Sequence, residues 1–393
     1  VMTIITLLMF FTTHLVPENM RLIYFIILYL VYIVGYTFQT ACTKAGQTVL
    51  TNDPEQRPLF STFDMSYTSL LFAGAAMYVS NYMVPKHGGF TESFFHEFVI
   101  TVVIASGVMT AIAVAGLWEH DRTENFGTGG VQEPIKLKDM FNIIKGNRPL
   151  QMLIVAASTD KLASTVSTNS IVMVMLFGIL IGDYGVFGSI SAITMIPVLI
   201  LIQIGTRYAR KFGSKKALVV STWMCIALYA AMFLLLWLGD PSQIRMTDMN
   251  AMSIAFVTLY ILATGVRNVS GGIVIPMIPD ITDYEVYKND RYAPGVMGTI
   301  LYVVDKMISS LGQTVIGILL AYIGFKEVFP SVDTPPSEEI FWVTMFLFVG
   351  MMILGWVASL IAMKFYELDD KRMAEIQMEL ADRRDAKKAA IEQ

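Results

Sequence analysis

Charged side chains lie inside several of the most apolar stretches of this sequence. Asp160, Arg267 and Lys306 are each well within a long apolar segment, and Asp305 is adjacent to Lys306. A charge inside a membrane-spanning helix costs roughly 3 kcal/mol on insertion scales, so it usually faces a partner or a water-filled cavity. These side chains therefore indicate a polar site that binds charges or hydroxyl groups. A buried ion pair that only joins two helices is the alternative for each of them.

Polar residues accompany these charges at helical spacing. Thr37, Thr40 and Lys44 recur every three or four residues, which places them on one face of a helix. Four other apolar segments carry similar polar groups, which include Asp64 with Tyr67, Asp160 with Ser164, Arg267 with Ser270, and Tyr302 with Lys306. Ser and Thr also hydrogen-bond between transmembrane helices, so one such group alone is compatible with simple packing. The five segments together predict the wall of a polar pathway.

Signatures of other catalytic or cofactor sites are absent from the sequence. The histidines have no metal-ligand spacing, and the sequence holds neither a phosphate-binding glycine loop nor a Ser/His/Asp arrangement. The two cysteines, Cys42 and Cys225, are far apart in apolar stretches and are interpreted as buried small residues. We therefore expect no metal site and no cofactor, and we do not expect an enzyme.

The composition places this pathway in a membrane. Hydrophobic residues make up 55% of the 393 residues, charged residues only 15%, and the mean hydropathy is +0.58. Ordinary soluble domains carry about 25% charged residues. These values exclude a soluble enzyme, a nucleic-acid-binding protein and a disordered scaffold. The net charge of −4 also offers no basic surface for nucleic acid.

Nine apolar segments are long enough to cross a bilayer as α-helices. They cover residues 21–44, 62–84, 97–117, 150–181, 186–206, 217–238, 251–279, 296–324 and 339–363. The first 13 residues form a shorter apolar run, which we interpret as the end of a span whose beginning is missing. About ten spans are therefore expected in an all-α membrane protein.

A long polar connection, residues 119–148, divides the chain. It separates the remainder of an N-terminal helix bundle (1–118) from a C-terminal six-helix bundle (149–364) and an exposed helical tail (365–393). Most Lys and Arg residues of the connections fall on the side of this loop and of the tail. The positive-inside rule then predicts a multi-pass protein of the cell membrane with a cytoplasmic C-terminus.

One cytoplasmic segment carries a more specific pattern. Asp280 and Asp283 are followed by Tyr284, Tyr287 and Lys288, and then by Arg291 and Gly295. This run resembles a signature of the glycoside–pentoside–hexuronide:cation symporters, an Asp-x-x-Asp-Tyr-x-x-(aromatic)-Lys run that follows the tenth helix of that family. The loop around residues 51–57 and the position of Lys306 also fit the family, and the melibiose permease branch is the most similar.

The resemblance implies a major facilitator fold. Such a protein has twelve helices in two six-helix halves, with a central site that opens alternately to each side of the membrane. The part missing here would be the first two helices and the start of the third. Thr37 then falls at a cation-site threonine, Thr40 at a sugar-binding aspartate, Lys44 at a sugar-stacking tryptophan, and Lys306 at the lysine of the eleventh helix.

Three departures indicate a remodelled site. Thr40 lacks the two charged oxygens with which a carboxylate holds sugar hydroxyls. Asp64 stands at or next to the usual place of an arginine, and Arg267 is an unusual charge for the tenth helix. The surplus of one positive charge within the spans favours an acidic substrate such as a uronide.

These observations give a defined set of site residues. The substrate-binding candidates are Thr40, Lys44, Asp64, Asp160, Arg267, Tyr302 and Lys306. Thr37 and Asp305 are candidates for the cation site, and the gate candidates are Arg57, Asp280, Asp283 and Arg291. The expected partners are a sugar-like small molecule, a coupling cation (Na⁺ or H⁺) and the lipid bilayer, without nucleic acid.

The predicted function is secondary active, cation-coupled symport of a sugar, glycoside or uronide by alternating access. A transporter of the same fold for a lysolipid, a drug or an organic anion is one alternative, which an aromatic, apolar cavity would favour. A membrane sensor or a membrane-embedded enzyme is another. A sensor should carry a soluble output domain and an enzyme a clustered catalytic set, and the sequence shows neither.

Overall fold

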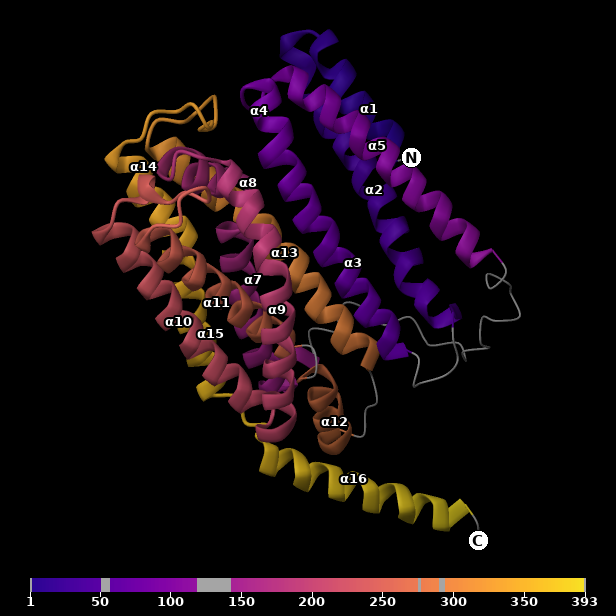
Figure 1. Ribbon diagram of the computed structural model, residues 1–393. Coiled ribbons are helices and arrows are strands. Elements are labelled where there is room, and N and C mark those ends of the chain that lie inside the picture. Colours follow the sequence, from indigo (N-terminus) through magenta and orange to yellow (C-terminus); the bar gives the residue numbers. More distant parts are fainter. Residues whose placement is uncertain (1, 51–56, 119–142, 275–276, 290–293, 392–393) are drawn as a thin grey trace. The chain divides into compact units, whose positions relative to one another are not determined.

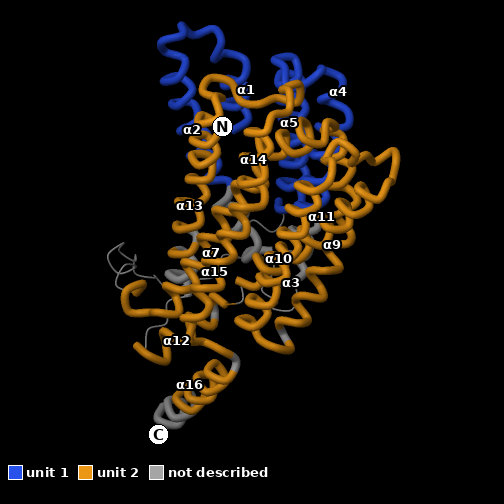
Figure 2. The backbone as a smooth tube through the Cα atoms, turned by 90° about the vertical axis from the view of Figure 1, so that its left-hand side faces the viewer, with its two compact units in different colours: residues 1–133 blue, residues 134–393 orange. Residues whose placement is uncertain are grey.

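The computed structural model describes residues 2–50, 57–118, 143–274, 277–289 and 294–391. The chain divides into two compact units, unit 1 (Val1–Glu133) and unit 2 (Pro134–Gln393), which Figure 2 shows in different colours. The four-part division expected from the sequence stays a prediction, because most of its central connection lies outside the described residues. Each unit is considered by itself below.

Unit 1 is a set of long apolar helices. Its elements are α1 (Met2–Thr12), α2 (Glu18–Leu50), α3 (Arg57–Tyr78), α4 (Val84–His87) and α5 (Glu92–Leu117), and a π-helical segment (Val79–Met83) joins α3 to α4. Helix α1 packs against both α2 and α5. The ring of Phe11 stacks on His96 with centroids 4.6 Å apart. The apolar side chains of α2 and α5 are largely exposed, as expected for helices whose solvent is lipid.

A polar turn joins α4 to α5. Gly88 takes the left-handed conformation (φ 66°) that ends α4, and the Thr91 side chain caps α5 by accepting a hydrogen bond from the Phe94 N–H. Glu97 then bridges the turn, because its carboxylate lies 2.6 Å from Lys86 Nζ and 3.0 Å from His87 Nε2. These contacts fix the hairpin that α4 and α5 form.

Unit 2 contains the longer series of helices (Figure 1). They are α7 (Arg148–Ser167), α8 (Ser170–Met173), α9 (Gly185–Phe212), α10 (Ser214–Leu238), α11 (Ala251–Ile273), α12 (Met277–Asn289), α13 (Pro294–Tyr322), α14 (Glu338–Met345), α15 (Met351–Lys364) and α16 (Asp370–Ile391). Two π-helical segments, η4 (Val174–Leu180) and η6 (Phe346–Gly350), continue α8 and α14.

The helices agree with a multi-pass membrane protein. Within the described residues, seven helices are long and apolar enough to cross a bilayer, or up to eight if a bent pair counts as one span. Six of them correspond to the predicted spans that begin at 97, 186, 217, 251, 296 and 339, and Glu18–Gln39 corresponds to the predicted span 21–44. The all-α membrane class is therefore confirmed.

The span predicted at 62–84 is not among the seven found within the described residues, and two other predicted spans differ in shape or length. The span expected at 150–181 is bent by 50° between α7 and α8. The bend follows from Asn169, whose side chain accepts from the Ile171 N–H and so starts a new helix. The span expected at 251–279 ends at Ile273, and residues 277–289 form the separate helix α12. Pro276 has no N–H to donate and restricts the residue before it, which opposes one continuous helix.

Helix α7 is central to the packing of unit 2. It packs against α15 and α13, while α10 packs against α11 and α15, and α9 against α11. A glycine permits the close approach of α15 to α7, because a Cβ atom at Gly355 of α15 would lie 2.8 Å from both the Ala163 Cβ and the Thr159 carbonyl oxygen of α7. Small residues commonly allow such close helix contacts in membranes, where van der Waals packing drives association.

The end of unit 2 that carries α12 has its own buried core. Ile281 of α12 and Ile376 of α16 are fully buried in one cluster with Leu150, Leu153 and other apolar side chains. Asn147 caps α7 and donates to Glu285 of α12 over 3.0 Å. Asn289 donates to the other Glu285 oxygen at 2.9 Å, so this buried carboxylate has two amide partners.

The tail helix differs from the expectation of an exposed segment. One face of α16 packs on α12, where Ile376 and Leu380 are 0% and 4% exposed. Arg372 and Arg383 both lie over the Tyr287 ring, at 5.6 and 5.4 Å from its centroid. The tail sequence is mostly charged, and its few apolar residues did not indicate that the helix packs on α12.

We expect Gly355→Ala to destabilise unit 2. The new methyl group meets a backbone carbonyl, which cannot yield unless α15 moves away from α7, and overpacking of this kind costs about 1–3 kcal/mol. Thermal unfolding of the purified protein in detergent should show a lower midpoint. Gly317→Ala is the matched control, because nothing lies within 4 Å of a Cβ there. Equal midpoints for the two variants would contradict the close contact.

We expect Ile376→Ala to lower the unfolding temperature, because removal of a fully buried Ile side chain costs about 2–5 kcal/mol. Met378→Ala on the same helix is the control, since Met378 is 63% exposed. Limited proteolysis should also cut the tail faster in Ile376→Ala. If both variants melt and digest as the parent does, the docking of α16 on α12 is wrong.

Candidate functional site

Part of the predicted site lies outside the described residues. Arg291 is not described at all, and the structure describes only the helical backbone at Thr40, Lys44, Arg57, Asp64 and Tyr302. Thr37 is described and is exposed on α2, where its hydroxyl donates to the Ile33 carbonyl of its own helix at 2.8 Å. Its role in a cation site stays a prediction.

An ion pair joins α7 to α13. Lys161 Nζ lies 3.1 Å from Asp305 Oδ1, with side chains that are 44% and 35% exposed. Asp305 therefore has a cationic partner and is only partly buried. Lys306, the next residue on α13, is exposed and points away from this pair, because successive helical residues differ by about 100° in direction. The structure thus separates the two adjacent charges that the sequence places side by side.

Asp160 occupies a different environment on the same helix. The residue is part-buried, but its Oδ1 atom is fully buried and has no hydrogen-bond partner among the described residues. The Ser359 side chain of α15 faces the carboxylate, yet its hydroxyl is also buried without a hydrogen bond. The two groups therefore approach each other without reaching hydrogen-bond geometry. Asp160 has no ion-pair partner in the described part of the chain.

Arg267 lies among aromatic side chains. Its guanidinium lies near enough to the phenol groups of Tyr229 on α10 and Tyr260 on α11, and to the thiol of Cys225, to affect them electrostatically. Tyr229 itself is 2% exposed and packs edge-on against Trp356 at 4.8 Å between centroids. No Asp or Glu within the described ranges forms an ion pair with Arg267. A guanidinium without a carboxylate is a ready receptor for an anion, since its fork of N–H donors matches carboxylate geometry.

The structure brings Asp160 and Arg267 into one bundle interior. Asp160 on α7 and Arg267 on α11 both lie near enough to the buried Cys225 of α10 to affect it electrostatically, and Ser359 of α15 lies beside Asp160. Lys161, Cys225, Tyr229, Tyr260 and Ser359 were not chosen from the sequence. Cys225 and Tyr229 are four residues apart, which places them on one face of a helix. Nothing in the sequence showed that this face of α10 lies toward Arg267.

Two of the predicted gate residues, Asp280 and Asp283, lie on α12. Asp283 accepts a hydrogen bond from Gln377 of α16, with 2.6 Å between Nε2 and Oδ2. Asp280 lies close to Tyr366, whose phenol is buried. Burial, and to a smaller extent the Asp280 carboxylate, raise the pKa of Tyr366 above its usual range, because both disfavour the phenolate. Asp283 thus contacts the tail helix, Asp280 lies near Tyr366 between α15 and α16, and a gate role stays a prediction.

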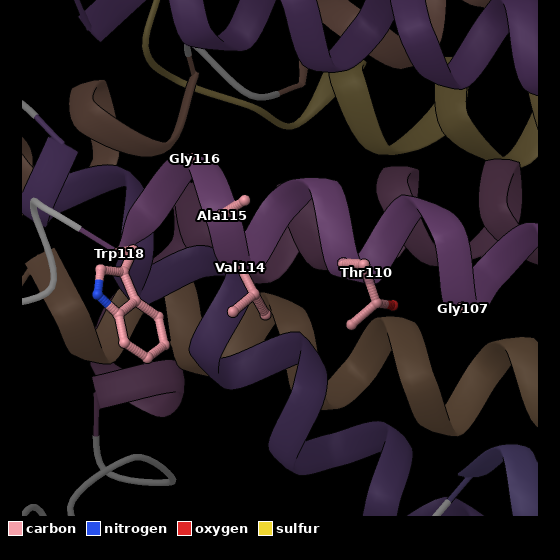
Figure 3. Close-up of a pocket in the computed structure, with 7 residues that line it drawn as sticks. Gly107, Thr110, Val114, Ala115, Gly116 and Trp118 are labelled. Carbon is pink, nitrogen blue, oxygen red and sulfur yellow. The ribbon is translucent and has the colours of Figure 1, made fainter.

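Two hollows on the protein surface contain none of the predicted site residues. One follows a single helix, α5, where Gly107, Thr110, Val114 and Gly116 leave an open face beside Trp118 (Figure 3). The other lies at the end of unit 2 opposite α12, between Gly178–Gly182, Asp240–Ser242 and Val332–Phe341. There the Ser242 hydroxyl and N–H both donate to Asp240 and hold its pKa below its usual range. Within the described ranges, no group of three or more His, Cys, Asp or Glu residues is placed to hold a metal.

We expect Lys161 and Asp305 to be coupled in a double-mutant cycle. Lys161→Met leaves the Asp305 carboxylate without its cation, Asp305→Asn leaves Lys161 without its anion, and the double variant removes both. Because the pair is partly exposed, solvent screening limits the coupling to about 1 kcal/mol or less. Thermal unfolding should show that the double variant loses less stability than the two single variants lose together. Simple additivity would show that the two side chains act independently.

Comparison with known proteins identifies the family of this chain. Residues 1–370 match the family described as "MFS/sugar transport protein". The "Uncharacterized symporter YnaJ" of Bacillus subtilis (strain 168) is 24% identical to this chain over 258 residues, which cover 64% of the chain and 50% of that protein. The chain therefore spans about half the length of the curated relative. The match covers both units, and the chain belongs to the MFS/sugar transport protein family, whose members are membrane transporters and not enzymes.

Proposed function

We propose that this chain acts in cation-coupled symport of a sugar, a glycoside or a uronide, by alternating access. Membership of a sugar transport family and the symporter relative both support transport of this class. The observation that carries the proposal is the interior of unit 2, where Arg267 meets Tyr229 and Tyr260 without a carboxylate partner. A polar cluster of this kind is costly inside a membrane and is usually kept for substrate.

The chemistry of this cluster favours a sugar that carries an acid group. Sugar hydroxyls need paired donors and acceptors together with an aromatic face, which Tyr229, Tyr260 and Asp160 can supply. A uronide adds a carboxylate, which a guanidinium binds through two parallel hydrogen bonds. Lys161 and Asp305 form an ion pair, so the charge of Arg267 is more available to a substrate than either of these two charges.

The remaining predicted residues have roles consistent with this proposal. Thr40, Lys44, Asp64, Tyr302 and Lys306 complete the substrate pathway, with Thr37 and Asp305 as candidates for the coupling cation, Na⁺ or H⁺. The α12 end lies in the cytoplasm according to the positive-inside pattern, with the protein in the cell membrane. Arg57, Asp280, Asp283 and Arg291 are the candidates for the gate.

A second candidate substrate has a specific observation in its favour. The rings of Phe177 and Phe256 surround Tyr260 at centroid distances of 6.0 and 5.8 Å. An aromatic organic anion would find the same guanidinium and a larger apolar contact there than a sugar does. An aromatic organic anion is therefore the main alternative to a uronide as the substrate.

We expect Arg267→Gln to abolish uptake of an acidic sugar. The experiment uses the intact protein in proteoliposomes with labelled methyl β-D-glucuronide or methyl β-D-glucoside, with or without a Na⁺ or H⁺ gradient. Loss of a charge-assisted bidentate contact should lower glucuronide uptake at least tenfold. Uptake of the neutral glucoside should fall less, and Arg267→Lys should restore part of the glucuronide uptake.

Arg245→Gln is the matched control, because Arg245 is exposed outside the spans. If folded protein accumulates neither sugar under any gradient, the sugar proposal is wrong. An aromatic carboxylate that is then accumulated through Arg267 would establish the organic-anion alternative.

A further inference from the structure

One face of α15 is exposed and apolar. Leu354, Val357 and Ile361 follow one another at helical spacing and are 57%, 42% and 58% exposed. Lys364 continues this stripe as the last residue of α15 and is also exposed. In a membrane-spanning helix such a stripe is suited to lipid chains, and a lysine at its end extends its ammonium group toward the head groups.

Helix α10 repeats this pattern. Lys216 lies in the first turn of α10 and is exposed, and Trp223, seven residues later on the same face, is 60% exposed. Helix α10 packs against α15 (Figure 1), and their ends meet, because Lys215 Nζ donates to the Tyr366 carbonyl. The two stripes therefore reach their lysines at the same end of unit 2, where residues of α7, α10, α12 and α15 share one buried core.

A third lysine lies close to Lys216. The ammonium groups of Lys211 and Lys216 are 5.2 and 5.1 Å from the centroid of the same ring, that of Phe212. Two like charges held around one ring repel each other unless an anion compensates them. Residues 184–239 contain five Lys and Arg residues but no Asp or Glu, so the neighbouring sequence supplies no such anion.

The acidic groups that follow Lys364 in the sequence already have partners. Glu367 lies 3.7 Å from the Arg148 guanidinium, and Asp369 accepts a hydrogen bond from the Arg372 N–H at the start of α16. Within the ranges that the structure describes, no carboxylate forms an ion pair with any of the three lysines. Their positive charges are therefore available to an anion from outside the chain.

We propose that Lys211, Lys216 and Lys364, here called the lysine cluster, bind the phosphate of an anionic phospholipid. The acyl chains of that lipid lie along the exposed stripes of α10 and α15. An anionic phospholipid matches both parts of this surface, because it joins a negative head group to apolar chains, and basic pockets at the ends of membrane helices are suited to such head groups.

The positive-inside rule alone does not account for this arrangement. It explains an excess of Lys and Arg on one side of the membrane, whatever their positions in the fold. It does not require two ammonium groups around one ring, or a lysine at the end of each of two neighbouring apolar stripes. A lysine near an anionic lipid surface strengthens binding about fivefold, so the cluster is sufficient for a measurable preference.

The first experiment compares two lipids with identical chains. Dioleoyl phosphatidylglycerol or dioleoyl phosphatidylcholine is titrated into the purified intact protein in detergent, and bound lipid is counted by native mass spectrometry. We expect phosphatidylglycerol to bind at least tenfold more tightly, with a preference that decreases as salt is added. Equal affinity for the two lipids overturns the proposal.

Variants then locate the lipid. The double variant Lys211→Gln with Lys216→Gln should weaken phosphatidylglycerol binding at least tenfold, and Lys364→Gln alone about fivefold. Replacement of Lys211 and Lys216 by Arg keeps both charges and should keep the preference. Arg245→Gln with Lys326→Gln is the matched control, because both are exposed cations outside the spans and the net charge changes equally.

The outcomes decide between the lipid and other ligands. Unchanged phosphatidylglycerol binding in the folded double variant, or an equal loss in the control, overturns the lysine cluster as the site. sn-Glycerol 3-phosphate carries a phosphate without acyl chains and should bind at least a hundredfold more weakly than the lipid. If it binds as tightly, the ligand is a soluble phosphate compound and the lipid proposal is wrong. None of these measurements involves the transported solute, so the proposed function is tested separately.

Discussion

The cost of an uncompensated charge in a membrane governs the interior of unit 2. Lys161 and Asp305 meet that cost by direct contact, at 3.1 Å and with partial access to solvent. Asp160 and Arg267 do not make such a contact among the described residues, and Asp160 Oδ1 has no hydrogen-bond partner there. A bundle that only needed stability would pair these charges or replace them with apolar residues, which is often neutral or stabilising. The proposed binding of a charged solute would give these two charges a role that stability alone does not require.

Close helix packing decides which side chains meet. Gly355 brings α15 against α7 near Thr159 and Ala163, and this contact directs Ser359 toward Asp160. Helix α10 then presents Cys225 and Tyr229 on one face, one turn apart, toward Arg267 of α11. Trp356 packs edge-on against Tyr229, and both rings are buried, so this side of the cluster is apolar.

The α12 end of unit 2 is more firmly connected than the charged interior. Glu285 is buried with two amide donors, Asn147 from the start of α7 and Asn289 from its own helix. The tail helix α16 adds the Gln377–Asp283 hydrogen bond and two arginines over Tyr287. Helix α12 lies in sequence between α11 and α13, which carry Arg267 and Asp305. A rearrangement of either span must therefore act on this polar and aromatic junction.

The sequence by itself determined the membrane class, the positions of most spans and the transporter family, because these depend on local hydropathy, helix length and a short polar motif. It also identified Asp160, Arg267 and Asp305 as unusual, since a charge in an apolar run is visible without a structure. Only the tertiary structure decided that Asp305 pairs with Lys161, that Ser359 faces Asp160, and that α16 docks on α12. Those contacts join residues on different helices, and their choice depends on helix rotation and close packing, which periodicity along one segment does not encode.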